Sequence, residues 1–274
     1  MSTSTIGRWF KQRDGITIDK SSSAVRWGLS IGGTLSFLVL WLLITEVYPL
    51  FIELILPSPV TMVENVLASR SLIMSNFWPT FGTAMGGFAL AVILGTIAAA
   101  VFTLSNVIER AFIPLAVSMN SVPRITLAPL IIFYFGNINA KLLISFWVAF
   151  FPMFLNAFEG LATIQDEEYD LLESLGATQW QEYRYIRIPN SIPHMFDGMK
   201  IAMTLAIVGA VVGEFVGAGS GLGTLALFGL RAFDTALVFG VTGIMGLVSV
   251  VLFFVLFSLQ DRLVYWKETK LFGE

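Results

Sequence analysis

Long apolar stretches separated by short polar ones make up most of this chain. Residues 71–108 and 235–260 contain no Asp, Glu, Lys or Arg. A helix of roughly 20 apolar residues crosses a hydrocarbon core about 30 Å thick, so both stretches are long enough to span a bilayer. The whole pattern predicts six spans, at about residues 28–49, 79–104, 112–135, 141–160, 197–217 and 236–259. We therefore expect an all-α polytopic membrane protein.

A charged segment between the fourth and fifth predicted spans carries the signals of two short helices. Its beginning is acidic, which complements a helix dipole, with Asp166, Glu167, Glu168 and Asp170. Leucines then recur at helical spacing, at Leu171, Leu172 and Leu175. Gly176 is suited to end the first helix because glycine tolerates a positive φ. Thr178 and Gln181 have the spacing of a capping box, so a second helix is expected at once, ending at Pro189.

Two interpretations of this segment differ in what its apolar side contacts. A helix lying on an anionic lipid leaflet usually has a polar face rich in Lys and Arg. Here the residues before Gly176 include five acidic side chains from Asp166 to Glu173 and no basic one. That charge favours docking into a groove of a protein partner over lying on lipid headgroups.

Composition supports the membrane prediction and removes several kinds of chemistry. Hydrophobic residues make up 56% of the 274 residues, charged residues 13%, and the mean hydropathy is +0.79. The absence of cysteine excludes thiolate nucleophiles and Cys-based metal sites, and a single histidine, His194, argues against a His metal cluster or a His-based triad. A net charge of −3 without a basic, aromatic-rich patch argues against nucleic-acid binding. We expect no catalytic residue, no metal site and no cofactor bound by this chain.

The distribution of basic residues predicts the orientation, because loops that stay in the cytoplasm retain Lys and Arg. With the N-terminus inside, 12 of the 16 Lys and Arg residues fall in inner segments and three in outer segments, while Arg124 lies in the third span. This places both termini and the charged segment in the cytoplasm.

Two outer segments, residues 50–78 and 218–235, are long enough to contact another molecule. The second begins with the glycine-rich sequence GAGSGLG at 217–223. Glycine-rich loops can bring backbone amides to a phosphate, but no Lys-Ser/Thr pair follows and no strand precedes this one. We expect a flexible extracytoplasmic turn.

Three residues are candidates for lining a solute pathway. Arg124 could meet an anionic solute inside the membrane, or reach the inner interface, or pair with Glu159. Glu214, near the outer end of the fifth span, could gate or bind a solute, or simply lie at the interface. Phe133 could contact a planar solute, although aromatic residues at such positions are more often packing or membrane-belt residues.

The charged segment resembles the cytoplasmic motif of ABC importer permeases, in which Glu-Ala-Ala is followed by Gly and then by Ile-x-Leu-Pro. Residues 170–172 stand at the Glu-Ala-Ala positions with the sequence Asp-Leu-Leu, Gly176 stands at the Gly, and Ile186, Ile188 and Pro189 complete the motif. Three further stretches resemble the subfamily that imports nitrate, taurine and aliphatic sulfonates: LPSP at 56–59, PRITLAPLIIFYFG at 123–136 and GEFVGAGSGLG at 213–223.

This resemblance implies a MetI-like permease fold with six transmembrane helices in a bacterial inner membrane. It implies a cytoplasmic N-terminal segment at 1–27, a permease domain at 28–260 with cytoplasmic coupling helices at about 165–188, and a cytoplasmic tail at 261–274. The residues that would contact the ATPase are Asp170, Leu171, Leu172, Glu173, Leu175, Gly176, Ala177, Thr178, Ile186 and Pro189. Partners would be ABC ATPase subunits that use ATP and Mg, an extracytoplasmic solute-binding protein, and a second permease chain, expected as a homodimer.

The expected function is therefore a non-enzymatic transport subunit, since the chain has no nucleotide-binding loop of its own. A small anion such as a sulfonate, taurine or nitrate leads as the solute, and a neutral heterocycle such as a vitamin precursor is the alternative. A secondary transporter would need ionisable residues deep in several spans, and a membrane enzyme would need a set of nucleophile, base or metal ligands. The sequence favours neither.

Overall fold

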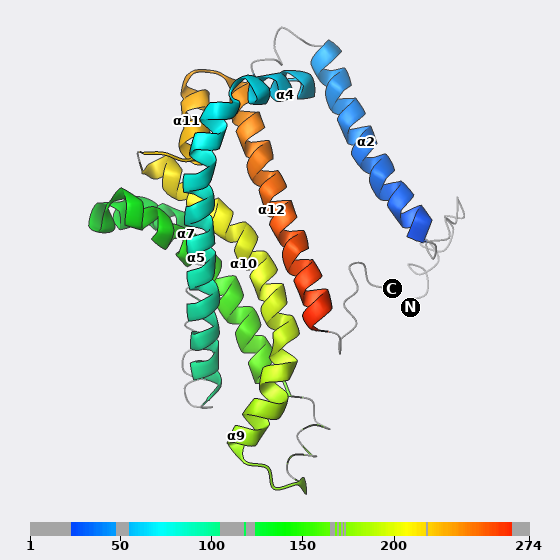
Figure 1. Ribbon diagram of the computed structural model, residues 1–274, viewed down its shortest axis with the longest axis vertical. Coiled ribbons are helices and arrows are strands. Elements are labelled where there is room, and N and C mark those ends of the chain that lie inside the picture. The colour runs from blue at the N-terminus through cyan, green and yellow to red at the C-terminus, as the bar shows by residue number, and fades with distance from the viewer. Residues whose placement is uncertain are drawn as a thin grey trace, which may run out of the picture. The chain divides into compact units, whose positions relative to one another are not determined.

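The computed structural model describes residues 23–47, 55–104, 118, 124–164, 168, 170, 172, 174–217 and 219–264. All regular structure in these ranges is helical, which confirms the predicted all-α fold (Figure 1). The helices are α2 (Ser23–Val47), α4 (Pro59–Ala68), α5 (Arg70–Thr103), η1 (Arg124–Leu127), α7 (Ala128–Ala162), α9 (Gln179–Glu182), η2 (Tyr183–Arg187), α10 (Ile188–Val216), α11 (Leu222–Arg231) and α12 (Thr235–Leu263). The chain divides into two compact units, Met1–Pro59 and Val60–Glu274.

The first unit contains α2, whose apolar side chains from Leu35 to Leu43 are exposed except for Trp41, which is half-buried. A hydrogen bond links this helix to the segment that follows it. The indole Nε1 of Trp41 donates to the carbonyl oxygen of Pro57 at 3.2 Å. An exposed apolar surface of this kind is expected for a helix surrounded by lipid or by other helices.

Within its described residues, the second unit holds four helices that are long and apolar enough to cross a membrane: Arg70–Thr103, Asn139–Ala162, Gln179–Val216 and Thr235–Leu263. They correspond to the second, fourth, fifth and sixth spans expected from hydropathy. Of the third expected span, 112–135, only residue 118 and residues 124–135 belong to the described part, where a short 3-10 turn leads into α7.

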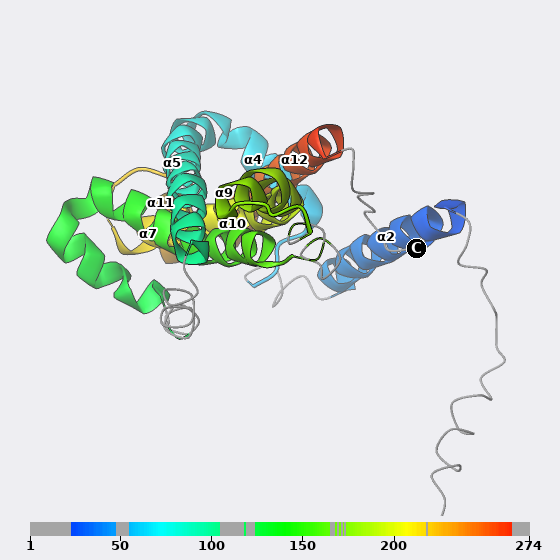
Figure 2. The same ribbon diagram turned by 90° about the horizontal axis from the view of Figure 1, so that it is seen from below.

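Small residues allow α5, α7 and α10 to pack closely, and the three helices lie side by side (Figures 1 and 2). A Cβ atom added at Gly87 of α5 would collide with the side chain of Ser145 on α7, and one added at Gly209 of α10 would lie 2.8 Å from the Ser145 Cα. The Ser145 hydroxyl donates across this contact to the carbonyl of Ala206 at 2.8 Å. Close approach and interhelical hydrogen bonds are the usual means of helix association in membranes, where helices gain little from hydrophobic burial.

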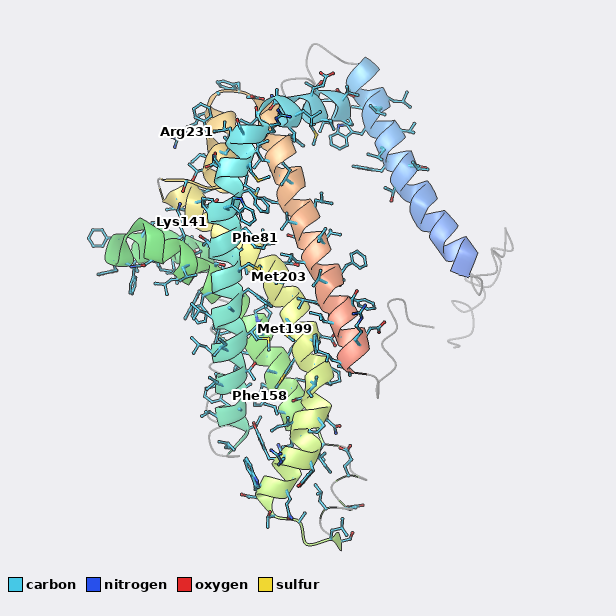
Figure 3. The ribbon with its side chains drawn as sticks, viewed as in Figure 1. Phe81, Lys141, Phe158, Met199, Met203 and Arg231 are labelled. Carbon is cyan, nitrogen blue, oxygen red and sulfur yellow. The ribbon has the colours of Figure 1, made fainter. Side chains whose placement is uncertain are left out.

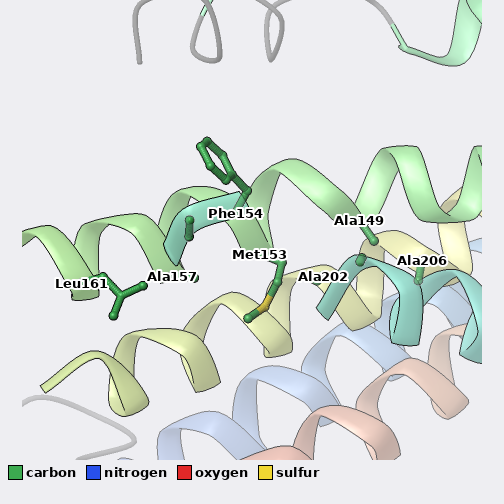
Figure 4. Packing of buried hydrophobic residues seen from close by; sticks show 9 residues of the cluster. Ala149, Met153, Phe154, Ala157, Leu161, Ala202 and Ala206 are labelled. Carbon is green, nitrogen blue, oxygen red and sulfur yellow. The ribbon is translucent and has the colours of Figure 1, made fainter. Parts of the chain in front are cut away.

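A larger apolar cluster continues this contact along the same helices. Figure 4 shows Ala149, Met153, Ala157 and Leu161 of α7 near Ala202 and Ala206 of α10, while the ring of Phe154 points away from α10. All seven side chains are buried. The bundle of α5, α7 and α10 is therefore the packed centre of this unit.

The helix α7 is broken at Gly136, which has φ 72° and ψ 164°. Its first part, from Ala128, leaves the bundle in a different direction from its second part (Figures 1 and 2). Only glycine adopts this φ without strain, so the sequence marks the break. Phe133, in the projecting part, is 82% exposed.

Two helices begin before the predicted starts of their spans. The second span was expected to begin at residue 79, but α5 begins at Arg70 and carries Pro79 in its interior. A proline removes one backbone donor, which a long apolar helix tolerates when neighbouring turns stay hydrogen-bonded. The fifth span was expected to begin at residue 197, but α10 begins at Ile188.

Pro189 does not end the second short helix as predicted. Residues Tyr183–Arg187 form a π-helical turn, and the amide of Ile188 bonds to the carbonyl of Tyr183, five residues back. In a regular helix the proline ring would clash with the carbonyl four residues earlier. The wider turn just before Pro189 relieves that clash, so α9, the π turn and α10 form one continuous helix.

Candidate functional site

A sharp bend joins the two short helices that the sequence predicted, and we call residues 168–187 the elbow. Gly176 has φ +60°, and the amide of Ala177 bonds to the carbonyl of Leu172, five residues earlier, at 3.0 Å. This is the Schellman arrangement that ends helices at a glycine. The described residues before it, Glu168, Asp170, Leu172 and Ser174, are helical. The predicted glycine stop is confirmed.

A capping box starts the second helix of the elbow, as predicted. The Thr178 hydroxyl accepts a hydrogen bond from the Gln181 amide, and the Gln181 side chain accepts one from the Thr178 amide at 2.8 Å. These two bonds satisfy amides that a helix start otherwise leaves without partners. Local contacts therefore favour the direction that the chain takes after Gly176.

The elbow presents apolar side chains to its surroundings. Leu175, Trp180 and Tyr185 are 72%, 68% and 69% exposed. Gly176 has no atom within 4 Å of the position a Cβ would take, so the space around the bend is open. Exposed aromatic and aliphatic side chains on a rigid bend suit a groove in another protein.

The remaining predicted elbow residues differ in how exposed they are. Ile186 and Pro189 are half-buried, Asp170 is exposed, and Ala177 is half-buried beside the bend. Leu171 and Glu173 lie outside the described residues. Asn190 donates through Nδ2 to the Glu168 carboxylate at 2.9 Å, which ties the first helix of the elbow to the start of α10.

A buried carboxylate lies at the opposite end of α10. Glu214 is only 1% exposed, and its carboxylate accepts hydrogen bonds from the Thr80 hydroxyl at 2.9 Å and from the Gly223 amide at 2.8 Å. Buried carboxylates need such donors because burial removes their hydration. Gly223 lies in the first turn of α11, so the negative charge also faces the positive end of that helix dipole.

The glycine-rich loop before α11 wraps around this carboxylate. The amide of Gly221 donates to Asn76 Oδ1 at 2.9 Å, and the amide of Leu222 donates to Thr80 Oγ1 at 2.7 Å. A Cβ at Gly221, which has φ +137°, would collide with the Glu214 carboxylate. We call Glu214, Thr80, Asn76 and residues 219–223 the carboxylate clasp.

Lys141 closes the clasp from a third helix. Its Nζ donates to the carbonyl of Ser220 at 2.9 Å, and its side chain is 8% exposed (Figure 3). The clasp therefore joins α5, α7, α10 and α11 through one loop.

The expectation of a flexible turn at 217–223 is wrong. Its described amides at residues 221–223 are held by side chains of α5 and α10, and α11 follows immediately. The Gly223 amide does bond to an anion, as amides do in a phosphate loop, but the anion is a carboxylate of the same chain. The only sequence signal for this contact was the position of Glu214 within nine residues of the glycines that follow it. Nothing in the sequence pointed to Asn76 or Thr80.

The predicted pathway residues are not brought together with the elbow. Ile188 and Glu214 lie 26 residues apart on α10, which is about 40 Å along a helix. Glu214 is buried in the clasp and does not lie at an exposed interface. Arg124 begins η1, and its side chain lies outside the described residues.

Glu159, the partner suggested for Arg124, is exposed on α7. Among the described residues, no group of three or more His, Asp or Glu side chains could hold a metal ion.

Comparison with known sequences gives a consistent set of relatives. The family described as "Binding-protein-dependent transport system inner membrane component" matches residues 91–266. The formylaminopyrimidine transport permease protein ThiX of Halalkalibacterium halodurans is 31% identical over 78% of this chain and 86% of its own length. The riboflavin transport system permease protein RibX of Chloroflexus aurantiacus is 33% identical over 80% of this chain and 82% of its own length. The taurine transport system permease protein TauC of Escherichia coli is 24% identical over 88% of this chain and 92% of its own length.

Among solved structures, the methionine ABC transporter MetNI in an inward-facing conformation contains a similar chain. The TM-score is 0.60 at 17% identity, over 72% of this chain and 97% of that one. This likeness shows a shared fold.

Proposed function

The chain belongs to the family of binding-protein-dependent transport system inner membrane components, and from this we propose that it forms the solute pathway of an ATP-driven importer, coupled to a separate ATPase. The family is one of ABC transporter permeases, which are non-catalytic transport subunits of the membrane. The division of labour with an ATPase chain is part of the proposal. In it, ATP and Mg are bound by that partner and not by this chain.

The elbow is the observation that carries this proposal. It is a bend whose angle is fixed by a left-handed glycine and a capping box, and it exposes Leu175 and Trp180 at its surface. A rigid, apolar bend at the end of a long helix can transmit a push along that helix. The elbow would dock in a groove of the ATPase, and closure of two ATPase subunits around nucleotide would move it.

The orientation belongs to the same proposal. Both termini and the elbow would lie in the cytoplasm of a bacterium, as the excess of inner basic residues predicts. The clasp, with α4 and α11 near it, would then face outward, where a solute-binding protein would dock. A second permease chain, expected as an identical copy, would complete the pathway.

The proposed solute is a small anion, such as a sulfonate, taurine or nitrate. A heterocyclic vitamin precursor is the second candidate, because the relatives named for formylaminopyrimidine and riboflavin are 31% and 33% identical to this chain. A panel of both solute classes, tested by thermal shift on the cognate binding protein, separates the two candidates. Stabilisation by a sulfonate, taurine or nitrate supports the first, and stabilisation only by heterocycles supports the second.

Replacing Gly176 by tryptophan tests the coupling proposal. The strain of a bulky residue at φ +60° would shift the bend, and the indole would fill the open space where the ATPase docks. We expect the variant to insert in the membrane normally, while co-purification of the ATPase or its vanadate-sensitive ATP hydrolysis falls at least tenfold.

Gly82→Trp is the matched control, since Gly82 also has open space around it but lies on α5, outside the elbow. Full co-purification and full hydrolysis with Gly176→Trp would contradict the proposal.

A further inference from the structure

The π turn between α9 and α10 has two sides that differ in their contacts. Within the sequence Tyr-Arg-Tyr-Ile-Arg at 183–187, Tyr183 and Arg187 are half-buried, whereas Arg184 and Tyr185 are exposed. One tyrosine and one arginine thus point to the bundle, and one of each points away from it. In the described part of the chain, Arg184 has no ion pair and Tyr185 has no hydrogen bond.

Arg187 contacts the end of α7. Its Nη1 donates to the carbonyl oxygen of Leu161 at 3.1 Å, and Nη2 pairs with Glu182 at 2.6 Å. α7 ends at Ala162, so the Leu161 carbonyl is one of the last four, which have no partner within the helix. A cation at this position also faces the negative end of the helix dipole. Arg187 therefore caps α7, and Glu182 of α9 holds the guanidinium in place.

Tyr183 contacts the end of α5 in the same way. Its hydroxyl lies 3.1 Å from the Thr103 hydroxyl and 3.4 Å from the carbonyl oxygen of Ala100. α5 ends at Thr103, so Ala100 also belongs to the last turn. Two side chains of one π turn thus contact polar groups at the ends of two different long helices.

Near this turn, the end of α7 also packs closely against the start of α10. A Cβ at Gly160 of α7 would lie 2.9 Å from the Ser191 Cα of α10. In the described part of the chain, Tyr183 and Arg187 make the polar links between the second helix of the elbow and the ends of α5 and α7.

We propose that Tyr183 and Arg187 form an elbow clamp that transmits movement of the elbow to the ends of α5 and α7. This rests on the proposed coupling function and names the residues through which it acts. Both are positioning residues, because they hold the spans to the elbow and touch neither solute nor nucleotide. Without the clamp, the elbow would still dock on its partner, but the ends of α5 and α7 would follow its movement less closely.

The natural absence of cysteine allows spin labels to be placed without background sites. One label is placed at Leu104→Cys, next to the end of α5, and the other at Gln179→Cys, in α9. The pair reports whether the end of α5 moves together with α9. Distances are measured by double electron–electron resonance on the full chain in nanodiscs. We expect a narrow distribution in the otherwise unchanged chain and a width at least doubled in Tyr183→Phe/Arg187→Ala.

Matched variants make this measurement specific. Tyr185→Phe/Arg184→Ala removes the same groups from the other side of the π turn and should leave the width unchanged. Tyr183→Phe alone removes one hydroxyl, keeps the fold, and should broaden the distribution on its own. Arg187→Lys keeps a cation at the end of α7 and should restore part of the narrow distribution. A narrow distribution in the double clamp variant would overturn the proposal.

A second arm uses the complex with the ATPase, trapped with ATP and vanadate. A single label at Leu230→Cys on α11 reports the distance between two permease copies. We expect a trapping-dependent shift with the native clamp and at most a third of it in Tyr183→Phe/Arg187→Ala, with ATPase co-purification unchanged. An undiminished shift would overturn the clamp. If the ATPase does not co-purify even with the native clamp, the proposed function fails, whereas the first arm still decides whether the clamp holds the helix ends.

Discussion

Removing the Glu214 carboxylate should open the loop before α11 without unfolding the bundle. In Glu214→Ala the Gly223 amide loses its acceptor, and the Thr80 hydroxyl loses its two carboxylate contacts. Thr80 can still donate to the Asn76 carbonyl in its own helix, 3.3 Å away. The amide has no such substitute in the described part of the chain. The substitution therefore leaves one buried amide donor without an acceptor and removes part of the stabilisation from a hydrogen bond to a charged group.

The size of the effect follows from those two losses. A buried donor left without a partner costs about 1–3 kcal/mol, and a hydrogen bond to a charged group contributes about 1.5–3 kcal/mol. With Thr80 partly compensated, we expect the clasp to be destabilised by about 2–4 kcal/mol. Since each 1.4 kcal/mol is a factor of about ten, local opening should become on the order of 100-fold more frequent.

Hydrogen–deuterium exchange of the peptide that covers residues 217–231 measures this opening directly. Glu214→Gln keeps the size of the side chain and one acceptor oxygen, so its exchange should be intermediate. Glu64→Ala removes an exposed carboxylate of α4 and should leave exchange unchanged. Exchange in Glu214→Ala within threefold of the unaltered chain would show that the carboxylate does not hold the loop, and the reasoning would be refuted.

Three further changes test the packing and the elbow. Gly87→Leu should lower the yield of folded protein in detergent severalfold, because the new side chain would collide with Ser145. Gly82→Leu, which meets open space, should leave the yield unchanged, and equal yields for the two variants would contradict the close helix contact. Thr178→Ala should destabilise the start of α9 by about 1 kcal/mol and speed amide exchange there several-fold. Thr178→Ser, which keeps the capping hydroxyl, is the control, and equal exchange in the two variants would contradict a stabilising role of the capping box. Gly176→Asn should be tolerated better than Gly176→Val by about 1 kcal/mol in thermal unfolding, because asparagine enters the left-handed region more easily and a β-branched residue does not; the reverse order would contradict the bend.

Local features of the elbow could be predicted from the sequence because they depend on neighbouring residues. The stop at Gly176 needs only a residue that tolerates positive φ, and the capping box needs only Thr178 and Gln181 three positions apart. Both signals lie within one or two helical turns. The continuation past Pro189 could not be predicted in this way, because the sequence does not show that a π turn would form in front of it.

The carboxylate clasp could not be predicted from the sequence, because it depends on residues far apart along the chain. Glu214 and the glycines were visible in the sequence, but their role depends on Thr80 and Asn76, more than 130 residues away. No local pattern relates these positions. The glycine-rich sequence by itself is therefore equally compatible with a flexible turn, and only the packing of the helices shows its contacts.

By itself, the sequence determined that this chain is helical, that it enters a membrane, and that a glycine bend with a capped helix follows the fourth span, since hydropathy and local backbone chemistry decide those features. The tertiary structure alone decided which side chains of the π turn face the bundle and which anion the glycine loop binds. Both depend on helices that meet at a distance in sequence, where packing and the need of buried polar groups for partners select one arrangement.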